Sequence, residues 1–407
     1  MARITVVTGG HLSTCPRMLK AADALQEAGH RVRVISTVST PWAADADAAF
    51  QSRPWAWERI DYMRQGNASR WLVSGARSRT ALAIARRMNS ETPAAVAARA
   101  IGRTHDELLD AILRDPGDLI YGGTRGAIAA VIEASRASGV PCGVDFEDFH
   151  CGEDEPDRDG ALRNALSVGI MREALAHAAF ATAGSAAIAD ACEATFGRRP
   201  IPINNVFTLP AAPRRTTHHG APRLYWFSQT IGPGRGIEDI IDGAGRAGIA
   251  AELHLRGVID ADYAVSLKHR AWTQARRVSV HVYEPAPPDR MVASCADFDA
   301  GISVEPDHIP NRALCLPNKA LVYPLAGLAL VLTATRGQLP LVSDTHGHAV
   351  TYRPGDLDVL ADGLTRLCDP LWRRQAQEAA WEAARTRWHW EHPLERDTLV
   401  AAVAAAR

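Results

Sequence analysis

The sequence predicts an α/β protein made of two doubly wound, Rossmann-like domains that face a cleft. A chain of 407 residues is too long for one hydrophobic core, so two domains are expected. In both halves, short apolar runs typical of buried strands alternate with helical patterns, as in parallel sheets covered by helices. The stretch 209–222 contains three prolines and is typical of a linker. We therefore predict domains at 1–208 and 223–386, and a terminal segment at 387–407 that crosses back to the first domain.

The composition excludes several classes of function. The net charge is −1 and 22% of the residues are charged, so no overall field attracts nucleic acid. Seven cysteines are scattered without a C-x-x-C pair, which argues against a disulfide framework and against a zinc knuckle. The N-terminal apolar run is too short for a signal peptide, and there is no run of eighteen apolar residues. We therefore expect a cytoplasmic protein with no nucleic-acid partner.

A βαβ unit opens the first domain. A strand over residues 3–8 leads into a glycine-bearing loop, a helix over 15–28 that Gly29 ends, and a second strand at 31–35. The loop lacks the G-x-G-x-x-G pattern, and no acidic residue follows the second strand to hold a ribose. These absences argue against a dinucleotide site.

The region 51–103 is basic and aromatic. Its arginines include Arg59, Arg64, Arg70, Arg77, Arg79, Arg86, Arg87, Arg99 and Arg103, and its aromatic residues include Trp55, Trp57, Tyr62 and Trp71. Such helices could lie peripherally on an anionic membrane or hold an anionic acceptor. The alternative is a solvated helical face whose tryptophans pack inward. The intervening apolar residues are mainly alanines, which favours that alternative.

An acidic loop follows the strand predicted at 140–144. After Asp145, further carboxylates cluster between Glu147 and Asp157, at what would be the carboxyl end of that strand. One interpretation is a solvated loop with helix-capping residues. The other is sugar recognition, because carboxylates accept hydrogen bonds from paired hydroxyls and can orient a reacting centre.

A glycine-rich loop at 232–236 separates a strand at 223–228 from a helix in the second domain. Glycine lets the backbone approach a ligand closely, and Arg235 stands just before the helix, where it could reach a diphosphate. The alternative is a structural glycine turn.

A second candidate phosphate site lies farther along this domain. Pro317 suits the first turn of a helix that Gly327 can end. The preceding strand, at 298–304, leaves a polar loop at 305–316 at its carboxyl end, where open α/β sheets bind ligands. The amides of the helix N-terminus, with Lys319 beside them, would suit a phosphate. Ordinary α/β architecture is the alternative.

The run Pro317-Asn318-Lys319, with Tyr323 four residues later, an Ala-Gly-Leu step and a β run, resembles a known segment. The segment is "PNK-x-x-E-Y-x-A-x-G-x-P-V" from the C-terminal domain of GT-B glycosyltransferases, in particular the retaining family 4. Looser resemblances extend over nearly the whole chain, including the "CPRMLK" helix and a terminal "W-E" helix. They imply the GT-B fold. They also imply transfer of a sugar, with retention, from a nucleotide-diphosphate sugar to a glycan, lipid-linked or small-molecule acceptor.

The resemblance also implies roles for individual residues. The donor diphosphate would be bound by Gly234, Arg235, Asn318 and Lys319, and no metal is expected because protein cations neutralise the leaving group. Ser228-Gln229 replaces the family's Gly-Arg and Arg235 replaces its lysine, so one positive charge is lost.

The first domain would bind the acceptor through Gly10, Ser13, Thr14, Asp145 and Asp148. Ser13 and Thr14 could instead be N-caps of the first helix.

Catalytic roles would fall to Glu305, Glu147 and His150. Glu147 stands where the family often has histidine, and His150 is the candidate replacement.

The chain departs from the family at two glutamates eight positions apart. Leu314 and Val322 occupy those positions, and valine cannot accept a hydrogen bond from a ribose hydroxyl. Glu305 is the candidate substitute for the donor-sugar contact. The missing pair suggests an alternative, a catalytically silent GT-B protein that binds nucleotide or glycan and supports a partner enzyme. A sugar-nucleotide epimerase, which needs no acceptor, is a third hypothesis.

Several patterns of possible metal ligands are interpreted structurally. They are the D-x-D pairs Asp45/Asp47 and Asp260/Asp262, the alternating Asp344, His346 and His348, and the linker pair His218/His219. His254 lies in an apolar strand and is interpreted as a core residue.

Overall fold

The computed structural model describes residues 1–88, 91–213, 220–286 and 290–406. They form two compact units. Unit 1 comprises Met1–Asn204, Ile309–Asn311 and Pro393–Arg407, and unit 2 comprises Asn205–His308 and Arg312–His392. Each unit contains one parallel sheet flanked by helices, which confirms the predicted α/β class with two Rossmann-like domains.

Unit 1 contains a seven-stranded sheet in the order β3-β2-β1-β4-β5-β6-β7. The strands are β1 (Arg3–Thr8), β2 (Arg31–Val38), β3 (Ala56–Asp61), β4 (Leu119–Gly123), β5 (Cys142–Phe146), β6 (Phe180–Ala183) and β7 (Ile201–Pro202). The chain moves outward from β1 to β3 and then returns to pair β4 with β1, so the strand order reverses between β1 and β4. Such a switch point is where open α/β sheets place ligands.

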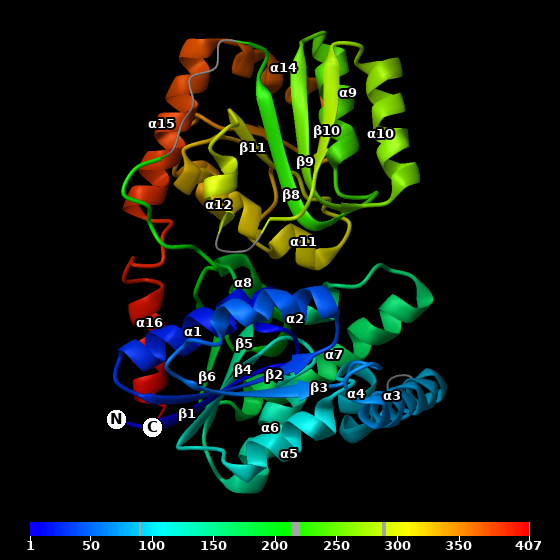
Figure 1. Ribbon diagram of the computed structural model, residues 1–407, viewed down its shortest axis with the longest axis vertical. Helices are drawn as coiled ribbons and strands as arrows, with labels where there is room; N and C mark the ends of the chain where they lie inside the picture. Colours follow the sequence, from blue (N-terminus) through cyan, green and yellow to red (C-terminus); the bar gives the residue numbers. More distant parts are fainter. Residues whose placement is uncertain (89–90, 214–219, 287–289, 407) are drawn as a thin grey trace. The chain divides into compact units, whose positions relative to one another are not determined.

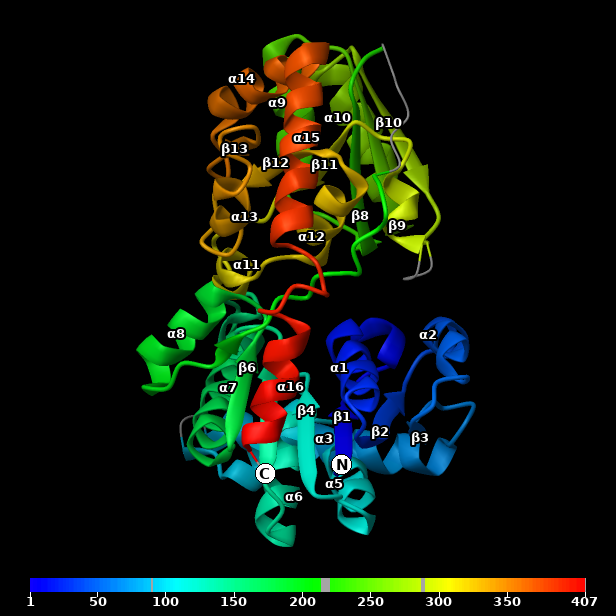
Figure 2. The same cartoon turned by 90° about the vertical axis from the view of Figure 1, so that its left-hand side faces the viewer.

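The helices of unit 1 cover both faces of its sheet (Figures 1 and 2). They are α1 (Pro16–Glu27), α2 (Pro41–Asp47), α3 (Ala68–Met88), α4 (Ala94–Ile101), α5 (His105–Arg114), α6 (Ile128–Ser138), α7 (Arg158–His177), α8 (Ala186–Phe196) and α16 (Arg396–Ala405). Helices α5, α6 and α7 pack in series on one face, and α1 packs with α16 on the other. Gly139 and Gly197, at φ of 73° and 77°, end α6 and α8 in the left-handed conformation.

Unit 2 contains a six-stranded sheet in the order β10-β9-β8-β11-β12-β13. The strands are β8 (Arg223–Ile231), β9 (Ala251–Ile259), β10 (Val278–Tyr283), β11 (Ala300–Ser303), β12 (Ala329–Thr333) and β13 (Val350–Tyr352). The helices are α9 (Ile237–Ala247), α10 (Ala261–Gln274), α12 (Asn318–Ala326), α13 (Leu339–Ser343), α14 (Leu357–Cys368) and α15 (Pro370–Thr386). Helix α11 (Pro310–Leu314) begins with two residues of unit 1 and ends with three of unit 2. One apolar cluster joins the sheet to α9, α10 and α14, and a second joins it to α12 and α15.

Helix α12 is fixed to the sheet by a close packing contact. A Cβ atom added at Gly301, in β11, would lie 2.1 Å from the ring of Tyr323. Only glycine therefore lets that ring lie flat against the strand. The Tyr323 hydroxyl donates a hydrogen bond to the carbonyl of Ile302 at 3.0 Å. Helix α12 is held in this way against β11.

The structure differs from the sequence-based expectations in several places. Pro317 is the N-cap of α12 rather than a residue of its first turn, because its ψ of 147° is extended. Helix α11 occupies part of the predicted polar loop. Strand β3 forms in a stretch where no strand was predicted. It lacks the apolar alternation typical of a strand, because only one of its six residues is buried.

The boundaries of the units also differ from the predicted ones. The division lies between Asn204 and Asn205 rather than after residue 208, and the terminal segment in unit 1 begins at Pro393 rather than at 387. Residues 214–219 of the predicted linker, with Arg214, Arg215, His218 and His219, lie outside the described residues. Among the described helices, none combines the length and apolar character needed to span a membrane.

Candidate functional site

In unit 1, the loop after β1 lies at the switch point of the sheet. The Gly9 amide donates to Thr124 Oγ1 at 2.9 Å, and Thr124, at the end of β4, has a φ of 72°. A threonine in this left-handed conformation is strained, and such strain is typical of functional loops. Gly10 adjoins this contact, and its carbonyl accepts a hydrogen bond from the Thr37 amide at 3.2 Å.

Ser13 and Thr14 are held within the same loop. The Ser13 hydroxyl donates to the carbonyl of Ala43 at 3.2 Å, and the Thr14 hydroxyl donates to the carbonyl of His11 at 3.0 Å. Neither side chain caps α1, whose N-cap is Cys15 without a side-chain hydrogen bond. The N-cap alternative is therefore wrong for both residues. Their hydroxyl oxygens can still accept a hydrogen bond from a ligand.

His11 and Asp47 fix the loop, and neither was identified as important from the sequence. His11 Nε2 accepts hydrogen bonds from the amides of Ser39 at 2.9 Å and Thr40 at 3.2 Å, so the proton of this neutral imidazole is on Nδ1. That nitrogen lies 2.9 Å from Asp47 Oδ2. Burial opposes the charge on Asp47, but the hydrogen bonds from His11 and Ser13 hold the pKa of its carboxyl below its ordinary value.

Asp145 is saturated by hydrogen bonds inside unit 1. Arg17 Nε donates to Oδ2 at 2.7 Å and Nη2 donates to Oδ1 at 2.5 Å, while the Thr182 hydroxyl donates to Oδ1 at 2.5 Å. Burial alone would raise the pKa of Asp145, but the Arg17 guanidinium holds it below its ordinary value. The fully buried carboxylate therefore serves to join β5, α1 and β6. We interpret it as a positioning residue.

Glu147, Asp148 and His150 gather in the loop after β5. His150 Nδ1 lies 2.5 Å from Glu153 Oε1, whereas His150 Nε2 has no hydrogen-bond partner among the described residues although the side chain is 2% exposed. Close packing fixes the backbone here, because a Cβ atom at Gly184 would lie 2.3 Å from the Glu147 carbonyl oxygen. The loop thus holds an unpaired imidazole nitrogen beside two carboxyl groups.

Burial and neighbouring charges shift the pKa values of the two acids and of the histidine in this loop. Burial, with the charges of Asp148 and Asp145, raises the pKa of Glu147 to about 8. Burial, with the charge of Glu153, also raises the pKa of Asp148. Burial works against the charged form of His150, but Glu153 and the other carboxylates raise its pKa. At neutral pH, Glu147 can therefore keep its proton and donate a hydrogen bond, and the surrounding carboxylates favour the charged form of His150.

In unit 2, Glu305 and Lys319 form a buried ion pair, although fourteen positions separate them. Glu305 follows β11 and its amide donates to Thr333 Oγ1 at 2.9 Å. Lys319 stands in the first turn of α12, and its ammonium lies 5.6 Å from the centre of the Trp226 ring. The structure thus unites a predicted catalytic residue with a predicted phosphate-binding residue.

The glycine loop after β8 brings further cations to the same edge of this sheet. Gly234 and Gly236 adopt φ of 72° and 73°, a conformation that favours glycine. Arg312, which the sequence did not indicate, donates to the Gly234 carbonyl at 2.8 Å. Arg235 forms no ion pair among the described residues. Arg312 thereby supplies the second cation that the sequence lacks next to Arg235.

The remaining donor-side residues have different surroundings. Asn318 Oδ1 accepts a hydrogen bond from Asn205 Nδ2 at 2.7 Å, which holds the start of α12. Val322 is 0% exposed and packs in the apolar cluster beneath that helix, and Leu314 is also buried. Both side chains are apolar and buried, so neither offers a ribose hydroxyl a hydrogen-bond acceptor.

The basic region of unit 1 contains a cavity of about 370 Å³. Its lining consists of Ser39, Pro41, Tyr62, Met63, Arg64, Gln65, Trp71 and Arg103. The Arg64 guanidinium lies 5.6 Å from the Trp71 ring centre, and that of Arg103 lies 5.2 Å from the ring centre of Tyr62. Neither arginine forms an ion pair in the described part of the chain. Two guanidinium groups and two aromatic rings therefore surround an open space where β2 and β3 end.

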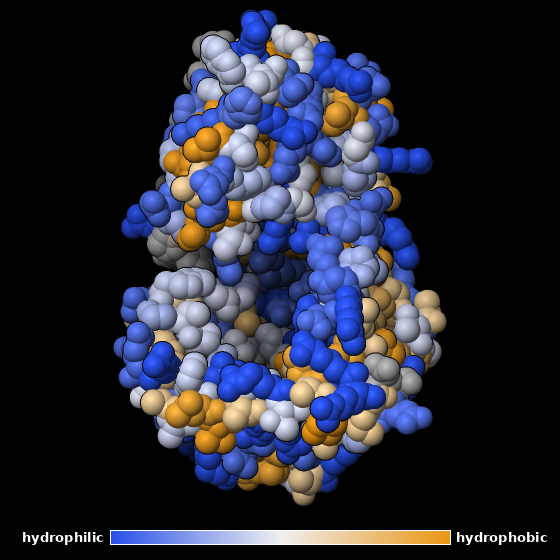
Figure 3. All heavy atoms as spheres, turned by 90° about the vertical axis from the view of Figure 1, so that its right-hand side faces the viewer, coloured by the Kyte–Doolittle hydropathy of each residue, from blue (hydrophilic) through white to orange (hydrophobic). Residues whose placement is uncertain are grey.

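Other residues of the basic region have structural roles. The indole nitrogens of Trp55 and Trp57 donate to Asp23 and Ser36, both at 2.9 Å. Arg77 pairs with Asp106 and Glu107. Exposed apolar residues of α3, including Leu72, Val73 and Ile84, are interspersed with charged ones, and the face that carries α3 shows this mixture (Figure 3). The inward packing of Trp55 and Trp57 agrees with the solvated-face interpretation.

Two of the possible metal ligands noted in the sequence, one from a D-x-D pair and one from the alternating 344–348 pattern, also have structural partners. Asp260 caps α10 by accepting hydrogen bonds from the amides of Asp262 at 2.9 Å and Tyr263 at 3.2 Å. Asp344 accepts a hydrogen bond from the Trp388 indole at 2.8 Å. These contacts give both aspartates structural roles, in line with the structural interpretation of their patterns.

Comparisons with known proteins identify the fold. No family model and no curated protein matches the chain. HepE from Anabaena in complex with UDP-glucose is similar in structure, with a TM-score of 0.65 and 15% identity over 100% of both chains. Sucrose-phosphate synthase from Thermosynechococcus elongatus has a TM-score of 0.64 and 12% identity over 100% of both chains. A TarM variant from S. aureus, in complex with UDP and two other ligands, has a TM-score of 0.65 and 9% identity over 99% of both chains. This chain has the GT-B fold. Membership of family 4 stays a prediction.

Proposed function

We propose that this protein is a glycosyltransferase that moves a sugar from a nucleoside-diphosphate sugar to an acceptor. The observation that carries this proposal is the group of cations at the carboxyl edge of the unit 2 sheet. Arg235, Arg312 and Lys319 come from three different segments, and the amides at the start of α12 add partial positive charge. The fold supports the proposal, because HepE, which shares it, was found with UDP-glucose.

In the proposed reaction, the bond between the anomeric carbon and the diphosphate oxygen breaks, and the leaving diphosphate takes the electron pair. An acceptor hydroxyl oxygen forms the new bond to the anomeric carbon, and its proton passes to the leaving diphosphate. Arg235 and Lys319 stabilise the new charge, so that no metal ion is needed for this step. The phosphate competes with Glu305 for the Lys319 ammonium. The freed Glu305 carboxylate can then accept hydrogen bonds from the donor sugar. Retention of configuration is part of the proposal and rests on the resemblance to family 4.

Unit 1 supplies the acceptor side in this proposal. The protonated Glu147 and the unpaired Nε2 of His150 can donate hydrogen bonds to sugar or phosphate oxygens. Gly10, Ser13 and Thr14 offer polar groups at the switch point of the same sheet.

We further propose that the acceptor carries an anionic group on or next to a ring. In the cavity of unit 1, Arg64 and Arg103 can pair with a carboxylate or phosphate, and Trp71 and Tyr62 can stack on a sugar or aromatic ring. An anionic lipid headgroup is the form of this ligand that would bring the protein to a membrane. Binding of p-nitrophenyl glucuronide, but not of the matched glucoside, would support the proposal. That difference should vanish in Arg64→Gln and persist in Arg87→Gln.

The donor proposal is tested by thermal shift and calorimetric titration with UDP, GDP, TDP, ADP and CMP. One nucleoside diphosphate should stabilise the wild type by about 2.7 kcal/mol at a hundredfold excess over Kd. Arg235→Gln should weaken its binding by at least about tenfold. The matched control is Lys268→Ala, on the exposed side of α10. If no nucleotide binds, or if both variants lose binding equally, the proposal is wrong.

A catalytically silent binding protein is the second candidate, and one observation favours it. Both positions of the family's glutamate pair are buried and apolar, at Leu314 and Val322, so the nucleotide lacks that carboxylate contact. Binding of a nucleoside diphosphate together with no turnover of the matching sugar nucleotide, with or without acceptor, would support this candidate. Conversion of the sugar nucleotide without acceptor would instead indicate an epimerase.

A further inference from the structure

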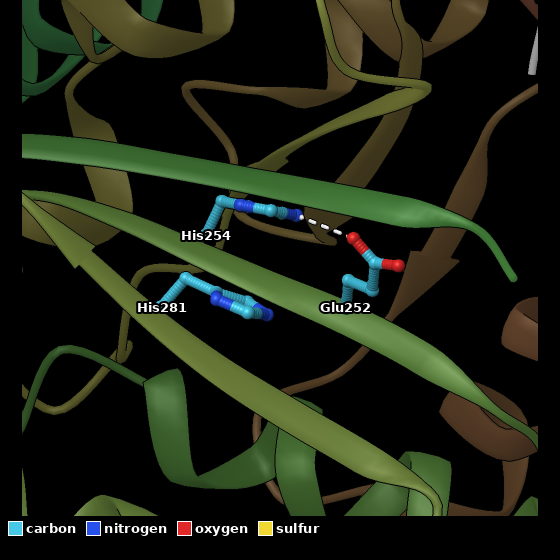
Figure 4. Close-up of side chains that lie close together, drawn as sticks. All are labelled: Glu252, His254 and His281. Atoms are coloured by element: carbon cyan, nitrogen blue, oxygen red, sulfur yellow. Dashed lines mark hydrogen bonds and ion pairs between the residues drawn. The ribbon is translucent and has the colours of Figure 1, made fainter.

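A cluster of three possible metal ligands lies in unit 2, on residues that the proposed transfer does not use. Glu252 and His254 are two positions apart in β9, so their side chains lie on the same face of the sheet. His281 in β10 is the direct cross-strand neighbour of His254. One ligand atom from each of the three residues lies within 4.8 Å of the others. Figure 4 shows the two imidazole rings side by side, with Glu252 next to that of His254.

The distances fit a site that is nearly formed. His254 Nε2 and Glu252 Oε2 are 3.2 Å apart. Two ligands of a tetrahedral zinc ion, each about 2.0 Å from it, are about 3.3 Å apart. The rings of His254 and His281 are stacked at 4.8 Å between their centres, so His281 has to move closer. Its side chain is exposed and can do so, after Nε2 leaves the Ser279 hydroxyl at 2.9 Å.

The environment of His254 favours metal binding by its imidazole ring. The His254 side chain is buried in the sheet, and the lone pair of a neutral imidazole nitrogen is what a metal ion needs. Its Nδ1 lies 2.9 Å from the Tyr283 hydroxyl. If Nδ1 carries the proton and donates it to that hydroxyl oxygen, the lone pair of Nε2 points at the ion. Hydrogen bonds of this kind orient metal-bound histidines in proteins.

We propose that Glu252, His254 and His281 bind a divalent transition-metal ion of the zinc class. The three side chains supply two nitrogen ligands and one carboxylate, and water or an added ligand takes the fourth position. All three stand on strands of one sheet, which is a more rigid support than a loop. The ion would cross-link the edge strand β10 to β9, which gives it a structural role that does not depend on the proposed transfer.

The test is a calorimetric titration of the EDTA-treated, full-length protein with ZnCl₂. The wild type should bind one equivalent, and cobalt(II) should give the intense visible absorption of a four-coordinate site. His281→Ala and Glu252→Gln should each weaken zinc binding by at least about tenfold. The matched control is His269→Ala, an exposed histidine on α10 that should leave binding unchanged.

His281→Ala removes an exposed side chain, so its melting temperature in EDTA should equal that of the wild type, which shows that it folds. Zinc should then raise the melting temperature of the wild type and of His269→Ala, but not that of His281→Ala. Equal binding by all variants would mean an adventitious ion only. That result, or no binding by the wild type, would overturn the proposal and leave a hydrogen-bonded cluster. Neither readout depends on glycosyl transfer.

Discussion

At the scale of single residues, the candidate site depends on charges that the fold partly buries. Glu147 lies near the carboxyl groups of Asp148 and Asp145, and Glu305 and Lys319 form a largely buried ion pair. Both arrangements cost stability unless every partner is present. A ligand that pairs with these groups can offset that loss of stability. The two arrangements lead to two predictions about the free energy of unfolding.

The first concerns the dependence of stability on pH. The pKa of Glu147 is about 8 in the folded protein, against an ordinary value of 4.5. The folded state therefore binds more protons than the unfolded state between these values, and stability falls as the pH rises through this window. Glu147→Gln stays neutral and avoids this loss. We expect the variant to exceed the wild type by as much as about 4 kcal/mol at pH 8.5 and to equal it at pH 4. Urea unfolding at a series of pH values measures the difference, and parallel profiles would contradict the pKa shift.

The second concerns the buried ion pair. Lys319→Ala leaves the Glu305 carboxylate buried without its partner, which should cost about 3–5 kcal/mol. The double variant Lys319→Met/Glu305→Gln removes both charges and should recover most of that loss. Urea unfolding of the wild type, both single variants and the double variant measures the coupling. Additive losses would show that the two side chains do not depend on each other.

At the scale of elements, the ends of strands and helices position the site. Helix α12 places Lys319 next to the end of β11, because Tyr323 in the same helix packs on that strand where only glycine fits. The loop after β1 is held by His11, whose two nitrogens bind backbone amides and Asp47. Short loops carry the functional groups, and buried contacts within the elements fix those loops.

The packing of α12 gives a third prediction. Gly301→Ala places a methyl group 2.1 Å from the Tyr323 ring, which cannot move freely because it is buried. We expect a loss of at least about 2 kcal/mol in stability, together with weaker nucleotide binding. Gly169→Ala in α7 is the control, since nothing lies within 4 Å of its added Cβ atom. That change should be neutral or stabilise by up to about 1 kcal/mol, because alanine favours a helix more than glycine does. Equal effects of the two substitutions would contradict the packing argument.

At the scale of the whole molecule, the residues proposed to bind the two substrates belong to different units. The proposed donor groups belong to unit 2, and the proposed acceptor groups belong to unit 1. Each unit has its own sheet and its own apolar clusters, so each can respond separately to a ligand.

This division gives a fourth prediction, measured by hydrogen exchange with mass spectrometry. The nucleoside diphosphate that binds should protect amides in the loop 232–236 and at the start of α12. It should leave the loop after β5 in unit 1 unchanged. The same titration with Arg235→Gln should show little protection in either place. Protection confined to unit 1 would contradict the assignment of the donor to unit 2.

The sequence by itself determined the two α/β units, because the alternation of apolar strands and amphipathic helices is a local pattern. It also indicated the polar loops at the ends of β1, β5, β8 and β11, since turn residues and charges stand next to those strands. Tertiary structure alone decided what the polar groups in these loops contact. Arg17 and Asp145 are 128 positions apart, and Arg312 lies 78 positions from Gly234. Strand β3 forms without an apolar pattern of its own because β2 pairs with it. Such contacts depend on how distant segments pack, and local periodicity carries no information about that packing.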